Sequence, residues 1–119
     1  MPKRDVVIVG AGLSGCLLAA YLAQRGHRVR VFERRGDPRV AGYAGGRSIN
    51  LALSVRGLWG LAGAGLDELV MRQDAIPMPG RMLHDREGRT SFQPYSKNPA
   101  DAINSVSRGG LNLTLLHAA

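Results

Sequence analysis

Apolar positions in the first third of the chain predict a strand, a helix and a second strand. Residues 6–9 form a continuous apolar run, which is typical of a strand buried on both faces of a parallel sheet. Apolar residues then recur at helical spacing over residues 17–22, and Gly26 suits the end of that helix. Residues 27–33 alternate apolar and polar side chains, which indicates a second strand that ends at Glu33.

A second alternating pattern lies within the stretch GRSINLALSVRG, residues 46–57. Apolar residues occupy every second position over residues 49–53, as in a half-buried strand with polar groups at both ends. The pattern then predicts a helix over about residues 55–62 and, after a glycine break, a shorter helix with an acidic first turn. We interpret Trp59 as a packing residue of the first of these helices.

A hairpin and a final helix are predicted in the last forty residues. Residues 80–95 alternate on both sides of the turn sequence REGR, which indicates two antiparallel strands. Residues 103–119 predict a short strand, a turn at Arg108 and a helix. His84 lies on the hairpin, and we assign it a structural role.

Composition places the chain among globular proteins. Its 119 residues are enough for one modest domain, and 45% of them are hydrophobic and 21% charged. No apolar run approaches the ~18 residues that would suggest a transmembrane helix. The basic start followed by an apolar run resembles a signal peptide, but Asp5 interrupts it and no cleavage-like segment follows. A lone cysteine, Cys16, cannot form an internal disulfide, so we expect a cytoplasmic protein in which Cys16 is a small core residue.

The net charge of +7 comes almost entirely from arginine, and six arginines lie between Arg25 and Arg39. Such a cluster could form a basic patch for nucleic acid. However, the chain has no recognisable nucleic-acid motif and few aromatic residues among the arginines. Arginines that are solvated, or that face an anionic cofactor, explain the excess more simply. We therefore expect no nucleic-acid partner.

The sequence GAGLSG joins the first strand to the helix and places Gly10, Gly12 and Gly15 in the spacing G-x-G-x-x-G. Gly10 permits a tight turn, Gly12 lets the backbone approach a pyrophosphate, and Gly15 lets helix and strand pack closely. The helix N-terminus, with Ser14 in its first turn, offers N–H groups and a positive dipole end to phosphates. Because two strands, the helix and a terminal acid accompany the glycines, the motif predicts a dinucleotide site rather than a turn used only for packing.

Glu33 follows Gly10 by 23 residues, at the tip of the second strand, where its carboxylate can accept hydrogen bonds from ribose hydroxyls. A negative charge there argues against a 2′-phosphate, so we expect FAD or NAD rather than NADP. The sequence ERRGDPR favours FAD, because a basic residue just beyond the acid commonly lies along the adenosine in FAD-binding folds of this type. Arg34 or Arg35 can do so, and a solvated turn is the alternative for both.

The motifs GAGLSG, FERRGDPR, GRSINLALSVRG, PMPGRMLHD, FQPY and SVSRGGLN together resemble those of the kynurenine 3-monooxygenases, a family of FAD-dependent aromatic hydroxylases. The resemblance spans nearly the whole chain. It implies an α/β fold: a Rossmann-type FAD-binding βαβ unit over about residues 5–34, then a flavin-edge strand and helices over 46–73. Part of a substrate-domain β-hairpin (80–95) and a strand, turn and helix (103–119) follow, and the fold is incomplete at the C-terminus.

The same resemblance implies roles for individual residues. Ala52 is expected to contact FAD from a strand that runs beside the flavin, and Arg108 to lie against its pyrophosphate or ribose side. A guanidinium suits phosphate because it forms bidentate hydrogen bonds. Arg81 is expected to hold the carboxylate of the amino-acid substrate, and Tyr95 to hydrogen-bond the same end. Without the resemblance, Arg108, Arg81 and Tyr95 would each more often be read as surface side chains.

The implied activity is hydroxylation of L-kynurenine to 3-hydroxykynurenine with FAD, NADPH and dioxygen, a step of tryptophan degradation. We expect no catalytic side chain and no metal ligand in these residues, and the oligomeric state is left open. Gly45 departs from the family, which usually has an arginine there, although Arg47 is kept. Family members are several hundred residues long, so we expect an N-terminal portion. A truncated, non-catalytic nucleotide-binding fragment, another FAD-dependent aromatic hydroxylase and an NAD dehydrogenase are the alternatives.

Overall fold

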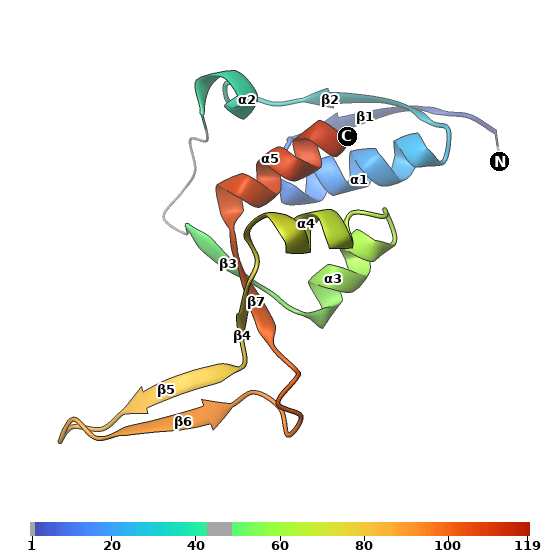
Figure 1. Ribbon diagram of the computed structural model, residues 1–119. Coiled ribbons are helices and arrows are strands. Elements are labelled where there is room, and N and C mark those ends of the chain that lie inside the picture. Colours follow the sequence, from blue (N-terminus) through green and yellow to red (C-terminus); the bar gives the residue numbers. More distant parts are fainter. Residues whose placement is uncertain (1, 43–48) are drawn as a thin grey trace.

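A computed structural model describes residues 2–42 and 49–119, and its first three elements form a parallel βαβ unit (Figure 1). Strand β1 (Asp5–Val9) leads through the glycine turn into helix α1 (Leu13–Gln24), and β2 (Arg28–Phe32) returns beside β1. The two strands are parallel, with Ile8 opposite Val31. The predicted strand–helix–strand order is therefore confirmed.

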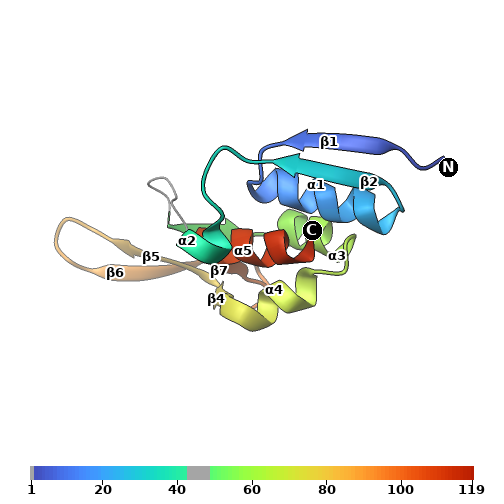
Figure 2. The same cartoon turned by 90° about the horizontal axis from the view of Figure 1, so that it is seen from above.

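The sheet formed by β1 and β2 is covered on one face by α1, and Figure 2 shows it as an outer layer over that helix. Ile8 is buried, but Val7 is 53% and Val9 87% exposed. The prediction that residues 6–9 are buried on both faces is therefore wrong for the described structure. The physical reason is that side chains alternate across a strand, and no described element covers the face that carries Val7 and Val9.

The middle of the chain forms a short helix, a strand and two longer helices. Helix α2 (Pro38–Ala41) is followed, after residues that lie outside the described ranges, by β3 (Asn50–Leu53), α3 (Val55–Ala62) and α4 (Asp67–Asp74). The predicted strand and helices at these positions are confirmed. Gly45, which departs from the family pattern, and Arg47, which keeps it, lie outside the described residues.

The end of the chain adds a second sheet and the last helix. Strand β7 (Ile103–Ser107) pairs antiparallel with β3 on one side and with the short β4 (Ile76–Met78) on the other. Helix α5 (Arg108–Ala118) follows β7 directly. The predicted turn at Arg108 is wrong, because Ser107 caps the helix through a 3.1 Å hydrogen bond from the Gly110 N–H, so that Arg108 is already helical.

The core lies where α1, α3, α4 and α5 meet the β3–β7 strands. Cys16 is a core residue, as predicted. Trp59, in contrast, is 82% exposed, so its assignment as a packing residue is wrong. Its helix buries Leu61 instead, and at about 100° per residue the two side chains point to nearly opposite sides of α3. The buried residues of this cluster are Cys16, Ala20, Leu53, Leu61, Ala64, Leu66, Val70, Val106, Leu111 and Leu115.

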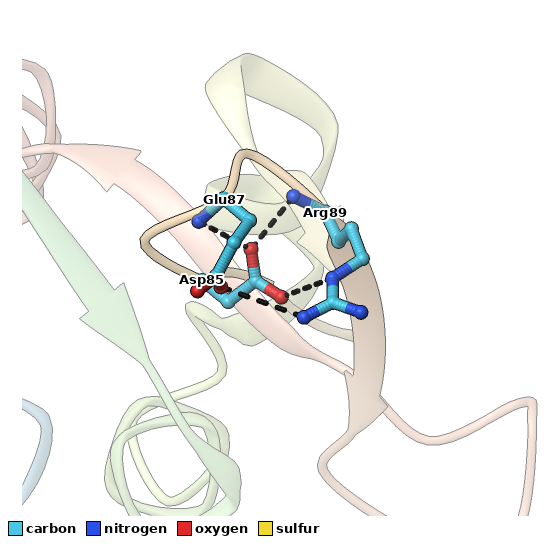
Figure 3. A network of polar contacts seen from close by, with 3 residues as sticks. All are labelled: Asp85, Glu87 and Arg89. Carbon is cyan, nitrogen blue, oxygen red and sulfur yellow. Dashed lines mark hydrogen bonds and ion pairs between the residues drawn. The ribbon is translucent and has the colours of Figure 1, made fainter.

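The predicted hairpin is confirmed as β5 (Gly80–His84) and β6 (Thr90–Pro94), which extend away from the helices (Figure 1). Its turn is held by the Asp85 carboxylate, which accepts hydrogen bonds from the backbone N–H groups of Glu87 and Arg89 (Figure 3). The Arg89 guanidinium adds a 2.8 Å ion pair to Asp85. The turn is thus stabilised within itself, although the hairpin is exposed along most of its length.

The projecting hairpin and the open sheet face make the molecule extended. Its radius of gyration is 17.6 Å, whereas a compact domain of this length has about 13.5 Å. Its accessible surface is 8761 Å², compared with about 6,200 Å² for a compact monomer of this mass. Across residues 2–42 and 49–119, no helix has the length and apolar character needed to cross a membrane. The cytoplasmic location stays a prediction.

Candidate functional site

A cleft of about 690 Å³ lies where β1 and β2 end and where α1 and α5 begin. Four segments meet there: the glycine turn, the end of β2, the turn that leads to α2, and the first turns of α5. The described residues that line the cleft are Ala11, Gly12, Leu13, Ser14, Gly15, Val31, Glu33, Arg35, Gly36, Asp37, Pro38, Arg39, Arg108, Asn112 and Leu116. The carboxyl end of a parallel sheet is where such folds bind their ligands.

The glycine turn has the geometry that its motif predicts. Gly10 adopts φ +106°, which favours glycine, and its N–H donates a 2.7 Å hydrogen bond to the Phe32 carbonyl. A Cβ at Gly15 would overlap the carbonyl oxygen of Gly10, so helix and turn pack too closely for a side chain. A Cβ at Gly12 would meet nothing within 4 Å and would stand in open space. The turn therefore leaves room for a ligand at Gly12.

The N-terminus of α1 opens toward this cleft. Within the described part of the chain no side chain caps the helix, and its first turn contains no acidic residue. Ser14 and Gly15, in that first turn, both line the cleft. Free backbone N–H groups and the positive end of the helix dipole attract anions, phosphates above all. The helix start can therefore bind a pyrophosphate.

Glu33 projects its carboxylate into the cleft and is already hydrogen-bonded there. One oxygen accepts a 2.7 Å hydrogen bond from the Ala11 N–H, and the other accepts a 2.9 Å hydrogen bond from the Arg35 N–H. These bonds, with the one from Arg35 first, lower the pKa of Glu33, so it is ionised at neutral pH. A carboxylate has about four acceptor positions, so two bonds leave capacity for ribose hydroxyls.

Helix α5 contributes two polar side chains to the cleft, Arg108 and Asn112. The Nε of Arg108 is buried and, among the described residues, has no hydrogen-bond partner. Such a donor is costly to bury unless something else binds it. Asn112 is only 7% exposed, and its side-chain amide donates a 3.1 Å hydrogen bond to the carbonyl of Ala11. The last helix is thus attached to the glycine turn.

Asp37 and Arg39 form an ion pair on the rim of the cleft. The Arg39 Nη2 lies 2.7 Å from a carboxylate oxygen of Asp37, and the Arg39 Nε also donates to this carboxylate. The hydrogen bonds from the Arg39 side chain are the main cause that lowers the pKa of Asp37 to about 2. The ion pair fixes the direction in which the Arg39 guanidinium points, whereas a lone exposed arginine has no fixed direction.

Several of the residues that the sequence predicts to bind the cofactor line this cleft in the structure: Gly12, Ser14, Gly15, Glu33, Arg35 and Arg108. Gly10 shapes the turn behind them. Arg34 is exposed and does not belong to the described lining of the cleft, and Ala52 is exposed on β3, opposite Ser105. The roles of these residues in cofactor binding stay predictions.

The two residues that the sequence predicts to bind the substrate lie elsewhere, on the hairpin. The Arg81 Nε donates a 2.7 Å hydrogen bond to the Gln93 side chain, which is its cross-strand neighbour. Tyr95, just beyond β6, is half exposed, and its N–H donates to the Pro79 carbonyl. Arg81 is the second residue of β5 and Tyr95 follows the last residue of β6, so both lie at the same end of the hairpin. Neither belongs to the described lining of the cleft. Their role in substrate binding stays a prediction.

Sequence reasoning missed Asp37, Arg39 and Asn112. The first two stand in the DPR stretch that belongs to the resemblance, but no role was assigned to them. Asn112 is a polar residue four positions after Arg108, and such residues lie on the same face of a helix. This spacing is the signal that could have identified Asn112 as a second residue of the site.

Known proteins match both the fold and the sequence. Residues 8–65 match the family model of an NAD(P)-binding Rossmann-like domain. The chain is 51% identical over 117 residues to the kynurenine 3-monooxygenase of Myxococcus xanthus and 50% identical over 117 residues to that of Stenotrophomonas maltophilia. This chain is similar in sequence to the kynurenine 3-monooxygenases. The resemblance predicted from its motifs is therefore confirmed, over 98% of the chain and about a quarter of the length of these relatives.

Solved structures confirm the predicted fold class. The chain superposes with a TM-score of 0.74 on 2-methyl-3-hydroxypyridine-5-carboxylic acid oxygenase, with 21% identity over 98% of the chain and 28% of that protein. It superposes with a TM-score of 0.72 on the myxobacterial chondrochloren halogenase, a variant of the FAD-dependent halogenases, with 24% identity over 98% of the chain and 26% of that protein. At these identities the likeness concerns the fold, a Rossmann-type α/β arrangement.

Proposed function

We propose that this chain is the FAD-binding portion of a kynurenine 3-monooxygenase, which hydroxylates L-kynurenine to 3-hydroxykynurenine with NADPH and dioxygen. The observation that carries the proposal is the cleft at the ends of β1 and β2. It joins an uncapped helix start, the Glu33 carboxylate and the Arg108 guanidinium, and it lies in a chain that is about half identical to enzymes of that name.

The residues of the cleft fit FAD by their chemistry. The partnerless Nε of Arg108 is suited to a phosphate or ribose oxygen, since a guanidinium donates several hydrogen bonds in one plane. The open space at Gly12 admits a pyrophosphate close to the backbone. Glu33 can accept hydrogen bonds from the ribose, and its negative charge disfavours a 2′-phosphate at this position. NADPH therefore acts as a co-substrate that binds elsewhere.

In this proposal the chain binds and orients, while the cofactor supplies the oxidative chemistry when it is bound. The N–H groups at the start of α1 and the Arg108 side chain hold the pyrophosphate end. Arg81 pairs with the carboxylate of L-kynurenine, and the Tyr95 hydroxyl donates a hydrogen bond to the same group. These contacts position the aromatic ring, and exclusion of water protects the reacting centre. No side chain of the chain is assigned a general-base role.

The test uses the natural full-length protein, purified and analysed for bound flavin. We expect stoichiometric FAD and kynurenine-dependent oxidation of NADPH, with 3-hydroxykynurenine identified as the product. Strong preference for another aromatic substrate would contradict the assignment to kynurenine while leaving the FAD site intact. A protein that binds NAD and no flavin would contradict the proposed cofactor itself.

A further inference from the structure

The backbone of Ala11, the second residue of the glycine turn, is held on both sides by distant side chains. Its N–H donates to Glu33, and its carbonyl accepts the 3.1 Å hydrogen bond from Asn112. The same carbonyl accepts a 3.3 Å hydrogen bond from the Cys16 thiol. The turn that must approach a pyrophosphate is thus fixed by segments that lie 22 and 101 residues further along the chain.

Asn112 and Arg108 lie one turn apart on α5 and both line the cleft. Arg108 offers a guanidinium to the ligand, and Asn112 fixes the backbone of Ala11, which lines the same cleft. The Cys16 thiol of α1 and the Asn112 amide both donate to the Ala11 carbonyl. One face of α5 therefore both supplies a candidate ligand contact and sets the distance between that contact and the glycine turn.

We infer that Asn112 is a positioning residue of the dinucleotide site, which acts through the Ala11 carbonyl and fixes the glycine turn relative to Arg108. The inference rests on the proposed function, since it assumes that the cleft binds the pyrophosphate of FAD. Loss of the amide donor leaves the partly buried Ala11 carbonyl with the weak thiol donor alone, and the turn is then free to shift. A shifted turn no longer presents its N–H groups to the same phosphate oxygens as Arg108.

Thr114 provides a matched control on the same helix. It is 8% exposed, close to the value for Asn112, and it is also hydrogen-bonded, through its hydroxyl, to Gln73 and to the Gly110 carbonyl. Thr114 does not belong to the described lining of the nucleotide cleft. A Thr114→Val change therefore perturbs α5 to a similar degree without releasing the glycine turn.

The experiment compares wild type, Asn112→Leu, Asn112→Asp and Thr114→Val in the natural full-length protein. Each is freed of flavin, and the Kd for FAD and the melting temperature without FAD are measured. We expect both Asn112 variants to bind FAD about tenfold more weakly, since the Ala11 carbonyl loses its amide donor and no longer holds the turn in place. ADP, which carries the adenosine and pyrophosphate alone, should be weakened by a similar factor. Thr114→Val should lower the melting temperature and leave both Kd values within about twofold of wild type.

An Asn112→Leu protein that binds FAD as tightly as wild type would overturn the inference, and Asn112→Asp decides in its place if the leucine variant does not fold. Equal weakening by Thr114→Val would overturn it too, because general loosening of α5 would then explain the effect. If wild type itself binds neither FAD nor ADP, the proposed function fails. If wild type binds both and the Asn112 variants do the same, the positioning role alone fails.

Discussion

The Glu33 carboxylate accepts a 2.7 Å hydrogen bond from the N–H of Ala11, which ties the tip of β2 to the glycine turn that follows β1. The Glu33 carboxylate therefore stabilises the fold even when no ligand is bound. Its second oxygen binds the Arg35 N–H and fixes the turn after β2. Glu33 thus connects the glycine turn to the turn after β2, and both turns line the cleft. The same side chain is the candidate acceptor for ribose hydroxyls.

We expect Glu33→Ala to weaken FAD retention by roughly an order of magnitude, because the ribose loses a charged acceptor and the turn loses its anchor. The measurement is the ratio of flavin to protein after purification of the full-length protein. Glu33→Gln keeps one oxygen acceptor and should retain an intermediate amount of flavin. Unchanged occupancy in Glu33→Ala would show that Glu33 is not at the ribose.

Gly12 and Gly15 should respond differently to alanine, although both belong to the same motif. A Cβ at Gly15 overlaps the Gly10 carbonyl, so Gly15→Ala should destabilise the fold by about 1–3 kcal/mol, the usual cost of overpacking. A Cβ at Gly12 meets no protein atom and enters the open cleft. Gly12→Ala should therefore leave the melting temperature without FAD unchanged and raise the Kd for FAD. Identical effects of the two changes would contradict the assigned geometry.

Local patterns predicted much of this fold because the elements concerned are stabilised by neighbours in sequence. The βαβ unit follows from an apolar run, a glycine turn and a helical period within thirty-odd residues, and the hairpin follows from alternation around a four-residue turn. The exposure of Val9 and Trp59 was not predictable in the same way. An apolar side chain indicates a preference for burial, but it does not say whether another element is present to cover it.

The site was predicted in part for a related reason. Gly12, Gly15 and Glu33 belong to one motif, and the spacing of that motif in the sequence predicts that its residues lie close together in the fold. Their presence in one cleft was therefore expected. The contact between Asn112 and Ala11 joins residues 101 positions apart, and no local pattern encodes it. The sequence did not identify Arg39, because the direction of its side chain depends on the ion pair with Asp37. That ion pair depends on the three-dimensional shape of the turn, which no local pattern gives.

Arg81→Met should raise the KM for kynurenine by roughly tenfold or more and leave the flavin content intact, since the change removes the proposed partner of the substrate carboxylate. Tyr95→Phe should have a milder effect, because it removes one neutral hydrogen bond. Arg86→Met, in the turn of the same hairpin, is the matched control and should leave the KM unchanged. Steady-state kinetics with kynurenine measures all three. Loss of flavin in Arg81→Met, or no effect at all, would contradict its substrate role.

The ion pair between Asp37 and Arg39 predicts a pH-dependent stability. Hydrogen bonds from Arg39 lower the pKa of Asp37 from its ordinary 3.8 to about 2. A lowered pKa means that the pair stabilises the fold above about pH 3.8 and that this contribution is lost as the pH falls toward 2. Wild type should therefore melt at a higher temperature than Asp37→Asn at pH 6, and the difference should vanish near pH 2. In an Arg39→Met background the pH-dependent part should be absent, and its persistence would show that another group causes it.

The 119-residue chain expressed alone should bind FAD weakly or not at all and should have no hydroxylase activity. Its cleft can hold the adenosine and pyrophosphate end, but Arg81 and Tyr95 stand on an exposed hairpin away from that cleft. The outer face of the β1–β2 sheet exposes Val7, Val9 and Phe32, and apolar patches of this kind favour aggregation or capture by a partner. The melting temperature of the isolated chain, measured with and without FAD, tests this expectation. A cooperative melt that FAD shifts upward, with micromolar affinity, would show instead that these residues form a self-sufficient binding module.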